Sequence, residues 1–254
     1  MDPKPLKTRG MLNEARSLKT FTLDQYAPPD DLSDIIAWFW LVRWNLPEGE
    51  TYRQSNLPHP VQHLVVDPQR QSGLFGCTKG RFDYDLSGSG AVLAARFHPA
   101  AASVIYNGPM SDLTDGFHKL TLPTDAPSPD MIDPLADIIR DIRAPLSNIA
   151  SEARAIVELI EQTPTLLRVA DVSEKTGIRI RQLQRLFAEY IGVSPKWVIE
   201  RYRMFEAVDA LNNSRDVNLA DLALRLEYSD QAHFNKQFKK MTGTSPGAYL
   251  TTRD

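Results

Sequence analysis

The feature that most constrains the fold of this chain is a motif that occurs twice between Ala170 and Pro246. The first copy reads ADVSEKTGIRIRQLQRLFAEYIGVSP and the second reads ADLALRLEYSDQAHFNKQFKKMTGTSP. Both copies open with Ala-Asp and close with Gly-x-Ser-Pro. Each is typical of a short helix, a turn of a few residues and a longer helix that carries basic and amide side chains. The repeat therefore predicts two helix-turn-helix units.

The capping residues of the repeat predict where its helices begin and end. In the first copy we expect helices over 169–175 and about 180–190, with a turn at Gly177, a residue that adopts positive φ at little cost. In the second copy we expect a start near Asn218 and a longer helix over about 230–241. Ser194 and Pro195 are the N-cap and first residue of a further helix, whose apolar face is formed by Val198, Tyr202, Phe205, Val208 and Leu211. Such a helix would hold the two units at a fixed separation.

The longer helix of each copy has one apolar and one polar face. In the first copy the inward residues are Leu183, Leu186 and Phe187, and the outward residues are Arg181, Gln184, Arg185 and Ala188. In the second copy Phe234 and Phe238 point inward, His233 lies at the margin, and the outward residues are Gln231, Ala232, Asn235, Lys236 and Lys239. Arginine and glutamine form bidentate hydrogen bonds with base edges in the major groove. These faces are therefore either base-reading surfaces or ordinary solvated helix faces.

A region typical of short β-strands precedes the repeat, from Tyr52 to about Phe97. The runs HLVVD, GLFGC, RFDYDL and AVLAARF alternate in polarity or are wholly apolar, and turn residues separate them. They predict a small antiparallel sheet or barrel. We expect a short helix in 98–106, and a further helix and strand within 113–122. Pro28-Pro29 predicts an extended entry to a helix or turn that Asp30 or Asp31 caps.

A dense aromatic group comprises Trp38, Phe39, Trp40 and Trp44. These rings either pack in a core or form the wall of a ligand pocket. On the second interpretation, the pocket of a small-molecule effector is lined by Trp38, Trp40, His63 and Phe97.

The boundaries follow from changes in composition. We expect a flexible tail over 1–20, a β-rich sensor or association domain over 21–130, a helical linker over 131–150 and a DNA-binding domain over 151–254. Apolar residues recur at helical spacing within 132–143. That segment is a linker, a dimer contact or the first helix of the C-terminal domain. The predicted fold class is α+β, with a barrel-like N-terminal domain and an all-α domain of two helix-turn-helix units joined by a long helix.

Composition and motifs bear on the remaining classes of function. The single cysteine, Cys77, excludes an internal disulfide. The sequence also has no apolar run of membrane length and no apolar signal core. Together with the single cysteine, these features predict a cytoplasmic protein without membrane contact. Cys77 could be the nucleophile of an enzyme, but the sequence fixes no partner histidine beside it. The alternative is that Cys77 is a buried structural thiol. The even spacing of His59 and His63 would place both on one face of a strand, as a cupin-like metal site requires, but Pro60 interrupts the run. We expect no enzyme, no metal and no cofactor, with an enzyme or cupin-like protein that carries a DNA-binding appendage as the alternative.

Charge is unevenly distributed along the chain. The net charge is −3, yet residues 161–254 carry two more basic than acidic side chains. The basic residues cluster at matching places in the two copies, as Arg179, Arg181 and Arg185 and as Lys236, Lys239 and Lys240. This distribution favours a phosphate-binding face in the C-terminal region.

Residues from about 155 to 251 resemble the DNA-binding module of AraC/XylS-type transcription regulators. The resemblance lies in LQRLFAEYIGVSPKWVIERYRMFEA and DLALRLEYSDQAHFNKQFKKMTGTSPGAYL. More loosely, YAPPDDLSDIIAWFW, LPHPVQHLVVD and ARFHPAAASVIYNGPMSDLTD resemble the small β-rich domain that precedes such modules. The resemblance implies a module of seven helices that binds promoter DNA sequence-specifically. It implies RNA polymerase as a partner, and leaves room for a small-molecule effector and a homodimer.

The resemblance also implies the contacts to DNA. The residues expected at DNA bases are Arg181, Gln182, Gln184, Arg185, Gln231, Ala232, His233, Asn235 and Lys236. Those expected at phosphates are Lys196, Lys239 and Lys240, together with helix N-termini. A non-specific architectural DNA protein is the rival within this class, and it would bind all sequences with an affinity set by salt.

Three residues depart from the usual pattern of the family. Arg179 stands where a small N-cap residue is usual, Glu227 where glycine is usual in the second turn, and Lys236 where arginine is more typical. A lost cap costs about 0.5–2 kcal/mol, and a lysine lacks the bidentate fork of arginine. We therefore expect the first copy to read bases more strongly, and the second to contribute more through attraction to the backbone.

Overall fold

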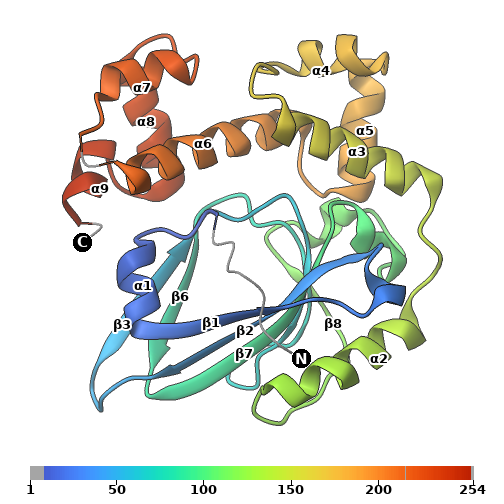
Figure 1. Ribbon diagram of the computed structural model, residues 1–254. Helices are drawn as coiled ribbons and strands as arrows, with labels where there is room; N and C mark the ends of the chain where they lie inside the picture. Colours follow the sequence, from blue (N-terminus) through green and yellow to red (C-terminus); the bar gives the residue numbers. More distant parts are fainter. Residues whose placement is uncertain (1–8, 215, 253–254) are drawn as a thin grey trace.

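The computed structural model describes residues 9–214 and 216–252, and it has a β-rich lower part and a helical upper part (Figure 1). The predicted α+β fold class is confirmed. The strands are β1 Phe21–Tyr26, β2 Ile36–Asn45, β3 Thr51–Asn56, β4 His63–Val66, β5 Gly73–Phe75, β6 Phe82–Ser87, β7 Ser89–Phe97 and β8 Phe117–Lys119. The α-helices are α1 Glu14–Thr20, α2 Ile132–Ile142, α3 Asn148–Gln162, α4 Val169–Thr176, α5 Ile180–Tyr190, α6 Pro195–Asn213, α7 Leu219–Arg225, α8 Gln231–Thr242 and α9 Pro246–Thr252. Short 3-10 turns are η1 Asp30–Leu32, η2 Ala101–Val104, η3 Met110–Leu113 and η4 Pro129–Met131.

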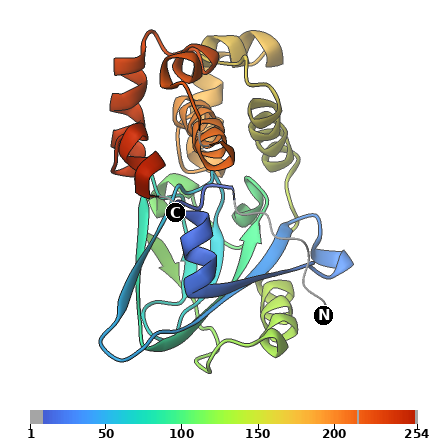
Figure 2. The same ribbon diagram turned by 60° about the vertical axis from the view of Figure 1, so that its left-hand side comes forward.

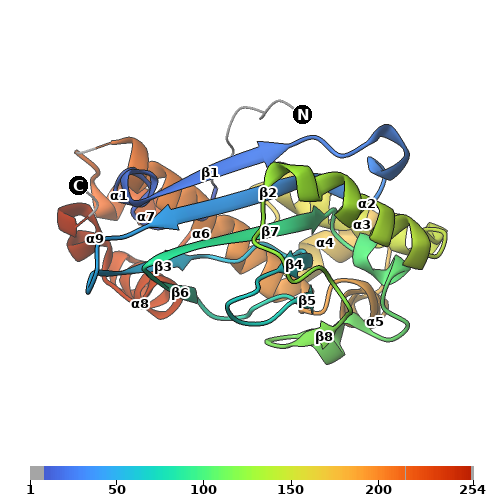
Figure 3. The same ribbon diagram turned by 90° about the horizontal axis from the view of Figure 1, so that it is seen from below.

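An antiparallel sheet with the strand order β1-β2-β7-β4-β5-β8 organises the lower part. Successive side chains of a strand point to opposite faces. On one face Leu41 of β2, Leu64 of β4 and Leu93 of β7 are fully buried in a common core. On the other face the alternating residues of the same strands line a cavity, and the two-stranded ribbon β3-β6 lies across it (Figure 3). The predicted runs 63–66, 73–75, 82–87 and 89–97 are all strands.

The stretch from Phe21 to Asn45 forms more strand than the sequence indicates. After Pro28-Pro29 there is a single 3-10 turn, η1, and then the ten-residue strand β2. Within 98–122 the two expected helices are the 3-10 turns η2 and η3, and the expected strand is β8.

Helix α2 packs against the sheet, below it in Figure 1, and does not bridge the two parts of the molecule. Its residues Ile132, Leu135, Ala136 and Ile139 are buried in the sheet's core. The interpretation of 131–150 as a linker is therefore wrong for α2, because its apolar stripe is needed to cover one face of the sheet. The same burial removes most of the apolar face that a dimer contact over 132–143 would require.

The expected flexible tail is also wrong for its described part. Residues 1–8 of that tail lie outside the described residues. Met11 and Leu12 are buried, Met11 forms a β-bridge with Asn56, and α1 follows directly. The apolar pair Met11-Leu12 within a polar stretch holds this segment across the edge of the β-rich part.

The helical part agrees closely with the repeat. Helices α4, α5 and α8 differ from the expected bounds by at most one residue, a margin at which assignments of helix ends ordinarily differ. The N-caps Ser194, Asn218 and Asp230 accept hydrogen bonds from backbone N–H groups of α6, α7 and α8. Helix α6 runs between the two units, with α4 and α5 at one end and α7, α8 and α9 at the other (Figure 1). Within residues 9–214 and 216–252, no helix combines the length and apolar character needed to cross a membrane.

The two parts of the molecule share one hydrophobic core. Leu12, Leu57, Cys77 and Ala100 from the β-rich part pack with the buried residues of α3 to α8. Polar contacts reinforce the junction: Arg201 of α6 is buried and donates to the carbonyl of Lys79 at 2.7 Å. The helix-turn-helix units are therefore seated directly on the β-rich part (Figure 2).

Candidate DNA-binding surface and internal cavity

Helix α5 presents a continuous polar face to solvent. Arg181, Gln182, Gln184 and Arg185 are exposed, whereas Leu183 and Phe187 are fully buried. Arg179, Arg181, Gln182 and Arg185 border one shallow depression at the start of the helix. Arg179 is the N-cap residue and its side chain makes no capping hydrogen bond. Arg179 Nε instead donates to Gln182 Oε1 at 3.3 Å, whereas Arg181 and Arg185 form no ion pair within the described residues.

Helix α8 has a similar but less open face. Gln231, Ala232, His233 and Lys236 are exposed, and Phe234 and Phe238 are buried. His233 Nδ1 lies 3.1 Å from Ser229 Oγ. Asn235, expected to point outward, is only half-exposed, and its Oδ1 is buried without a hydrogen-bond partner among the described residues. The expected outer stripe of the second copy is therefore complete except at Asn235.

The turn that precedes each of these helices requires positive φ. Gly177 follows α4 with φ 73°, and Glu227 stands after α7 with φ 58°. The strained backbone expected at Glu227 is thus observed, and its side chain is exposed. Strain of this kind costs about 1–2 kcal/mol at a residue with a Cβ.

The two helices lie on the same side of α6. Seen from below, α5 and α8 lie toward the same edge of the molecule, with α6 running between the two units (Figure 3). The three lysines expected at phosphates, Lys196, Lys239 and Lys240, are exposed. Lys196 has Glu200 at 3.8 Å as a weak, exposed ion-pair partner. The helical part therefore carries two exposed polar helices toward one edge, together with three exposed lysines.

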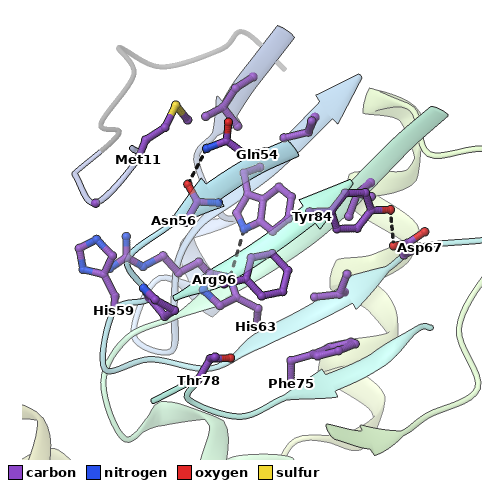
Figure 4. A pocket seen from close by; sticks show the side chains of 18 of the residues that line it. Met11, Gln54, Asn56, His59, His63, Asp67, Phe75, Thr78, Tyr84 and Arg96 are labelled. Carbon is purple, nitrogen blue, oxygen red and sulfur yellow. Dashed lines mark hydrogen bonds between the residues drawn. The ribbon is translucent and has the colours of Figure 1, made fainter. Parts of the chain in front are cut away.

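Beneath the helices, a cavity of about 450 Å³ lies between the sheet and the β3-β6 ribbon (Figure 4). Trp38, Trp40 and His63 line it, as the sequence predicts. Phe97 does not: it is fully buried in the core on the opposite face of the sheet. The reason is strand alternation, because Arg96, the neighbour of Phe97 on β7, points into the cavity.

Arg96 is a cavity residue that the sequence does not lead one to expect. It pairs across the strands with Trp38 on β2 and with His63 on β4, so it occupies the middle of the cavity face. Its guanidinium carbon lies 4.2 Å from the centre of the Trp38 ring. Burial lowers the pKa of Arg96 to about 10. A charged group inside the run AVLAARF was the available signal.

The two cavity histidines are neutral. Burial, and then the charge of Arg96, lowers the pKa of His63 to about 3, and His63 Nδ1 accepts a hydrogen bond from Trp40 Nε1 at 3.1 Å. Burial also holds the pKa of His59 well below its usual value. The His59 ring stacks on Phe205 of α6 with their centres 4.3 Å apart. His59 therefore belongs both to the cavity wall and to the junction with the helices.

Cys77 is a buried structural thiol. Burial raises its pKa to about 12, and its Sγ lies 3.1 Å from the carbonyl oxygen of Ile191 at the end of α5. Gln62 Nε2 donates to the same oxygen at 2.8 Å. A thiol of this kind is a poor nucleophile, because the reactive species is the thiolate.

Two family models match the chain. Residues 172–252 match a helix-turn-helix domain, and residues 24–119 match a domain of unknown function, DUF6597. The first match covers both helix-turn-helix units apart from the start of α4, and the second covers the six-stranded sheet apart from the first residues of β1. Each family model thus covers one of the two parts of the molecule.

Curated relatives align with the C-terminal region. The chain is 26% identical over 102 residues to the probable transcription factor PqrA of Proteus vulgaris, which covers 40% of this chain and 83% of that protein. It is 31% identical over 83 residues to the HTH-type transcriptional activator AarP of Providencia stuartii, covering 33% of this chain and 61% of AarP. It is 31% identical over 88 residues to the HTH-type transcriptional regulator ExsA of Pseudomonas aeruginosa, covering 34% of this chain and 31% of ExsA.

Solved structures also match the chain. The C-terminal domain of AraT, a response regulator from Geobacillus stearothermophilus, is 26% identical with a TM-score of 0.37, over 43% of this chain and 88% of that one. ToxT from Vibrio cholerae is 12% identical with a TM-score of 0.42, over 91% of this chain and 98% of that one. The chain therefore combines a helix-turn-helix domain, similar in sequence to these transcription regulators, with a preceding DUF6597 domain.

Proposed function

We propose that this protein regulates transcription by inserting α5 and α8 into two successive major grooves of one DNA duplex. The observation that carries the proposal is the pair of polar helix faces on the same side of α6. Successive major grooves on one side of B-DNA are spaced by roughly 34–36 Å. Helix α6 is 19 residues long, which corresponds to roughly 28 Å at 1.5 Å per residue. A helix of this length is of the right size to hold two reading helices about one DNA turn apart.

The residues proposed to contact bases are those of the two polar faces: Arg181, Gln182, Gln184, Arg185, Gln231, Ala232, His233, Asn235 and Lys236. Among these, Arg181 and Arg185 have no carboxylate partner within the described part of the chain. Arginine forms bidentate pairs with guanine, and each good pair discriminates against the wrong base by about 1–3 kcal/mol. We propose that α5 supplies most of the sequence preference.

Helix α8 is proposed to contribute mainly through the DNA backbone. Lys236 lacks the fork of arginine, and Asn235 is partly withdrawn from the surface. Lys239, Lys240 and Lys196 are exposed cations that suit phosphate contacts. Glu227 brings a carboxylate to the turn before α8, where it would oppose a nearby phosphate.

We propose different roles for the β-rich part and the helical part. Residues 21–142 form the sensing part, with its effector in the cavity that Trp38, Trp40 and His63 line. Residues 148–252 form the DNA-binding part, because α3 packs in the same core as α4 to α8. RNA polymerase is the proposed partner at the promoter. A homodimer stays a prediction, and α2 is no longer its proposed contact.

Binding to an operator selected from random duplexes tests this function. The operator is selected on the purified full-length protein, and fluorescence anisotropy then gives the affinity for it and for single-base variants. Arg185→Ala is expected to weaken operator binding by about 5- to 150-fold, equivalent to about 1–3 kcal/mol, and to relax preference at one position. Lys239→Ala is expected to weaken binding to all duplexes alike. It should also reduce the slope of log affinity against log salt concentration by about one.

The matched control is Arg53→Ala, which removes the same charge from an exposed site on β3. It should leave the affinity within about 2-fold, since exposed ion pairs contribute little to stability. If Arg185→Ala and Arg53→Ala bind the operator equally well, α5 does not read bases. If selection yields no preferred sequence, the architectural alternative is correct.

A further inference from the structure

The cavity described above is large enough and sufficiently apolar to hold a small organic molecule. Its volume of about 450 Å³ lies within the roughly 300–1,000 Å³ typical of small-molecule sites. Aromatic walls come from Trp38 and Trp40 on β2, Phe75 on β5 and Tyr84 on β6. An apolar body of flat shape would gain burial against these rings.

Arg96 introduces an uncompensated positive charge into this cavity. Among residues 9–214 and 216–252, no carboxylate forms an ion pair with its guanidinium, and its Nε is buried without a hydrogen-bond partner. The contact that it makes with the Trp38 ring leaves the in-plane N–H groups unused. A buried cation without a counter-charge is costly, and proteins rarely retain one without a partner.

The acidic groups near the cavity are already engaged elsewhere. Asp67 Oδ2 accepts from the Tyr84 hydroxyl at 2.8 Å, and its Oδ1 accepts from the backbone of Gln69. Glu161 of α3, whose charge acts on Arg96 from the helical side, forms an ion pair with Arg9 at 3.3 Å. Arg9 in turn is shared among three carboxylates. Among the described residues, no carboxylate is therefore left to pair with Arg96.

The other charged groups that line the cavity, Arg9, Asp67 and Arg70, have partners of their own, Arg70 through the backbone carbonyl of Asp85 at 2.8 Å. Several further polar groups of the cavity wall are neutral. Gln54 Nε2 donates to Asn56 Oδ1 at 3.0 Å, and Thr78 lies at the opposite side of the cavity opening in Figure 4. His59 and His63 flank Arg96 in Figure 4 as neutral rings. Among the described residues, Arg96 is the cavity cation with neither an ion pair nor a hydrogen-bond partner, and one such cation matches one negative charge. A phosphate dianion would leave one of its charges uncompensated in the cavity.

We propose that the cavity binds a small organic carboxylate, whose carboxylate group pairs with the guanidinium of Arg96 and whose aromatic or otherwise apolar body lies against Trp38, Trp40 and Phe75. The inference rests on the proposed function, since it names the chemical class of the effector. Arginine and carboxylate form two parallel hydrogen bonds, which would satisfy the unused N–H groups. Neutral analogues of the same shape lack that pairing.

Calorimetric titration of the full-length protein tests the proposal with three probes and their neutral counterparts. The probes are benzoate, 3-phenylpropionate and 1-naphthoate, each compared with its primary amide, and 1-naphthyl phosphate supplies a dianion of similar body. At least one carboxylate is expected to bind with a dissociation constant below about 1 mM. Its amide should bind at least about 10-fold more weakly. The phosphate should bind more weakly than the best carboxylate.

Variants then locate the site. Arg96→Gln is expected to weaken the best carboxylate by at least about 10-fold, and to abolish the difference between acid and amide. The matched control is Arg43→Gln, because Arg43 is an exposed guanidinium on β2 outside the cavity. That variant should bind like the unmodified protein. The comparison of acid with amide in the unmodified protein needs no variant, so a folding defect in Arg96→Gln would not prevent the test.

Four results would overturn the proposal: no carboxylate binds at about 1 mM, acid and amide bind equally, the phosphate binds more tightly, or Arg96→Gln binds like the unmodified protein. Operator binding is measured on the same preparation. Intact operator binding with no carboxylate binding would sink the ligand class and leave the DNA-binding function standing. Carboxylate binding without any operator preference would instead contradict the DNA-binding function and leave the ligand class standing.

Discussion

Replacing Arg96 by methionine is expected to stabilise the ligand-free protein. Burial lowers the pKa of the guanidinium from 12.5 to about 10, and each pKa unit corresponds to about 1.4 kcal/mol. The full shift would therefore destabilise the folded state by roughly 3 kcal/mol. Because the side chain faces a cavity and is not fully enclosed, water reduces that penalty, and we expect a net gain of about 1–2 kcal/mol on removing the charge.

The packing terms of this substitution largely offset each other. Arg96 loses its contact with the Trp38 ring, 4.2 Å away, which contributes about 0.5–2 kcal/mol. Methionine has a similar length and makes its own favourable contact with an aromatic ring, about 0.3–1.5 kcal/mol. The charge term therefore decides the sign. For a chain of this size, the gain corresponds to a rise in Tm of about 2–8 °C.

Thermal unfolding without ligand measures the effect, with Arg96→Lys and Arg43→Met as controls. Lysine keeps the buried charge, so that variant should show no gain, and methionine at the exposed Arg43 should change Tm little. The sign of the pH dependence follows from the lowered pKa: the penalty is fully present below pH 10 and shrinks as the pH rises through 10 toward 12.5. A fall in Tm on Arg96→Met at neutral pH would refute the reasoning, because it would mean that Arg96 already has a counter-charge in the free protein.

Two other predictions concern the turn before α8 and the junction between the β-rich part and the helices. Glu227→Gly relieves the strain of a positive φ of 58° but adds flexibility to the unfolded chain, so urea unfolding should show a change in stability within about 1 kcal/mol. Fluorescence anisotropy should show that this variant binds all duplexes more tightly. Weaker binding would contradict the proposed position of Glu227 beside a phosphate. Burial raises the pKa of Cys77 to about 12, so a thiol reagent at pH 8 should modify it only as fast as the protein opens. Immediate reaction in the native protein would show that the thiol is not enclosed between Gln62 and Ile191.

The sequence predicts the helical part well because its signals are local. Helix α5 has the expected bounds, since its apolar period and the preceding Gly177 lie within a few residues of one another. The positive φ at Glu227 followed from the position of a glycine in the resembled family. Contacts between neighbours in the sequence are sufficient to decide such features.

The β-rich part was harder to predict because its strands are covered on both faces. In β2, Phe39 and Leu41 enter the core while Trp38 and Trp40 line the cavity, so the run is apolar throughout and shows no alternation. Helix α2 has a clear apolar stripe, yet nothing local indicates whether a sheet or a second subunit covers it. Phe97 was misplaced because its neighbour Arg96 takes the cavity position, and successive side chains of a strand point to opposite faces.

The cavity wall contacts the long helix α6, and this contact would link a ligand in the cavity to the position of that helix. His59 lines the cavity and stacks on Phe205 of α6, and its Nε2 lies 2.7 Å from the carbonyl oxygen of Arg9. Arg9 in turn bridges Glu161 of α3 with Glu206 and Asp209 of α6. A ligand anion at Arg96 would add a negative charge beside this network, on the side from which Glu161 and Tyr202 already act on Arg96. Since α6 sets the spacing of α5 and α8, any preference of the ligand for one arrangement of this junction must appear as an equal change in DNA affinity.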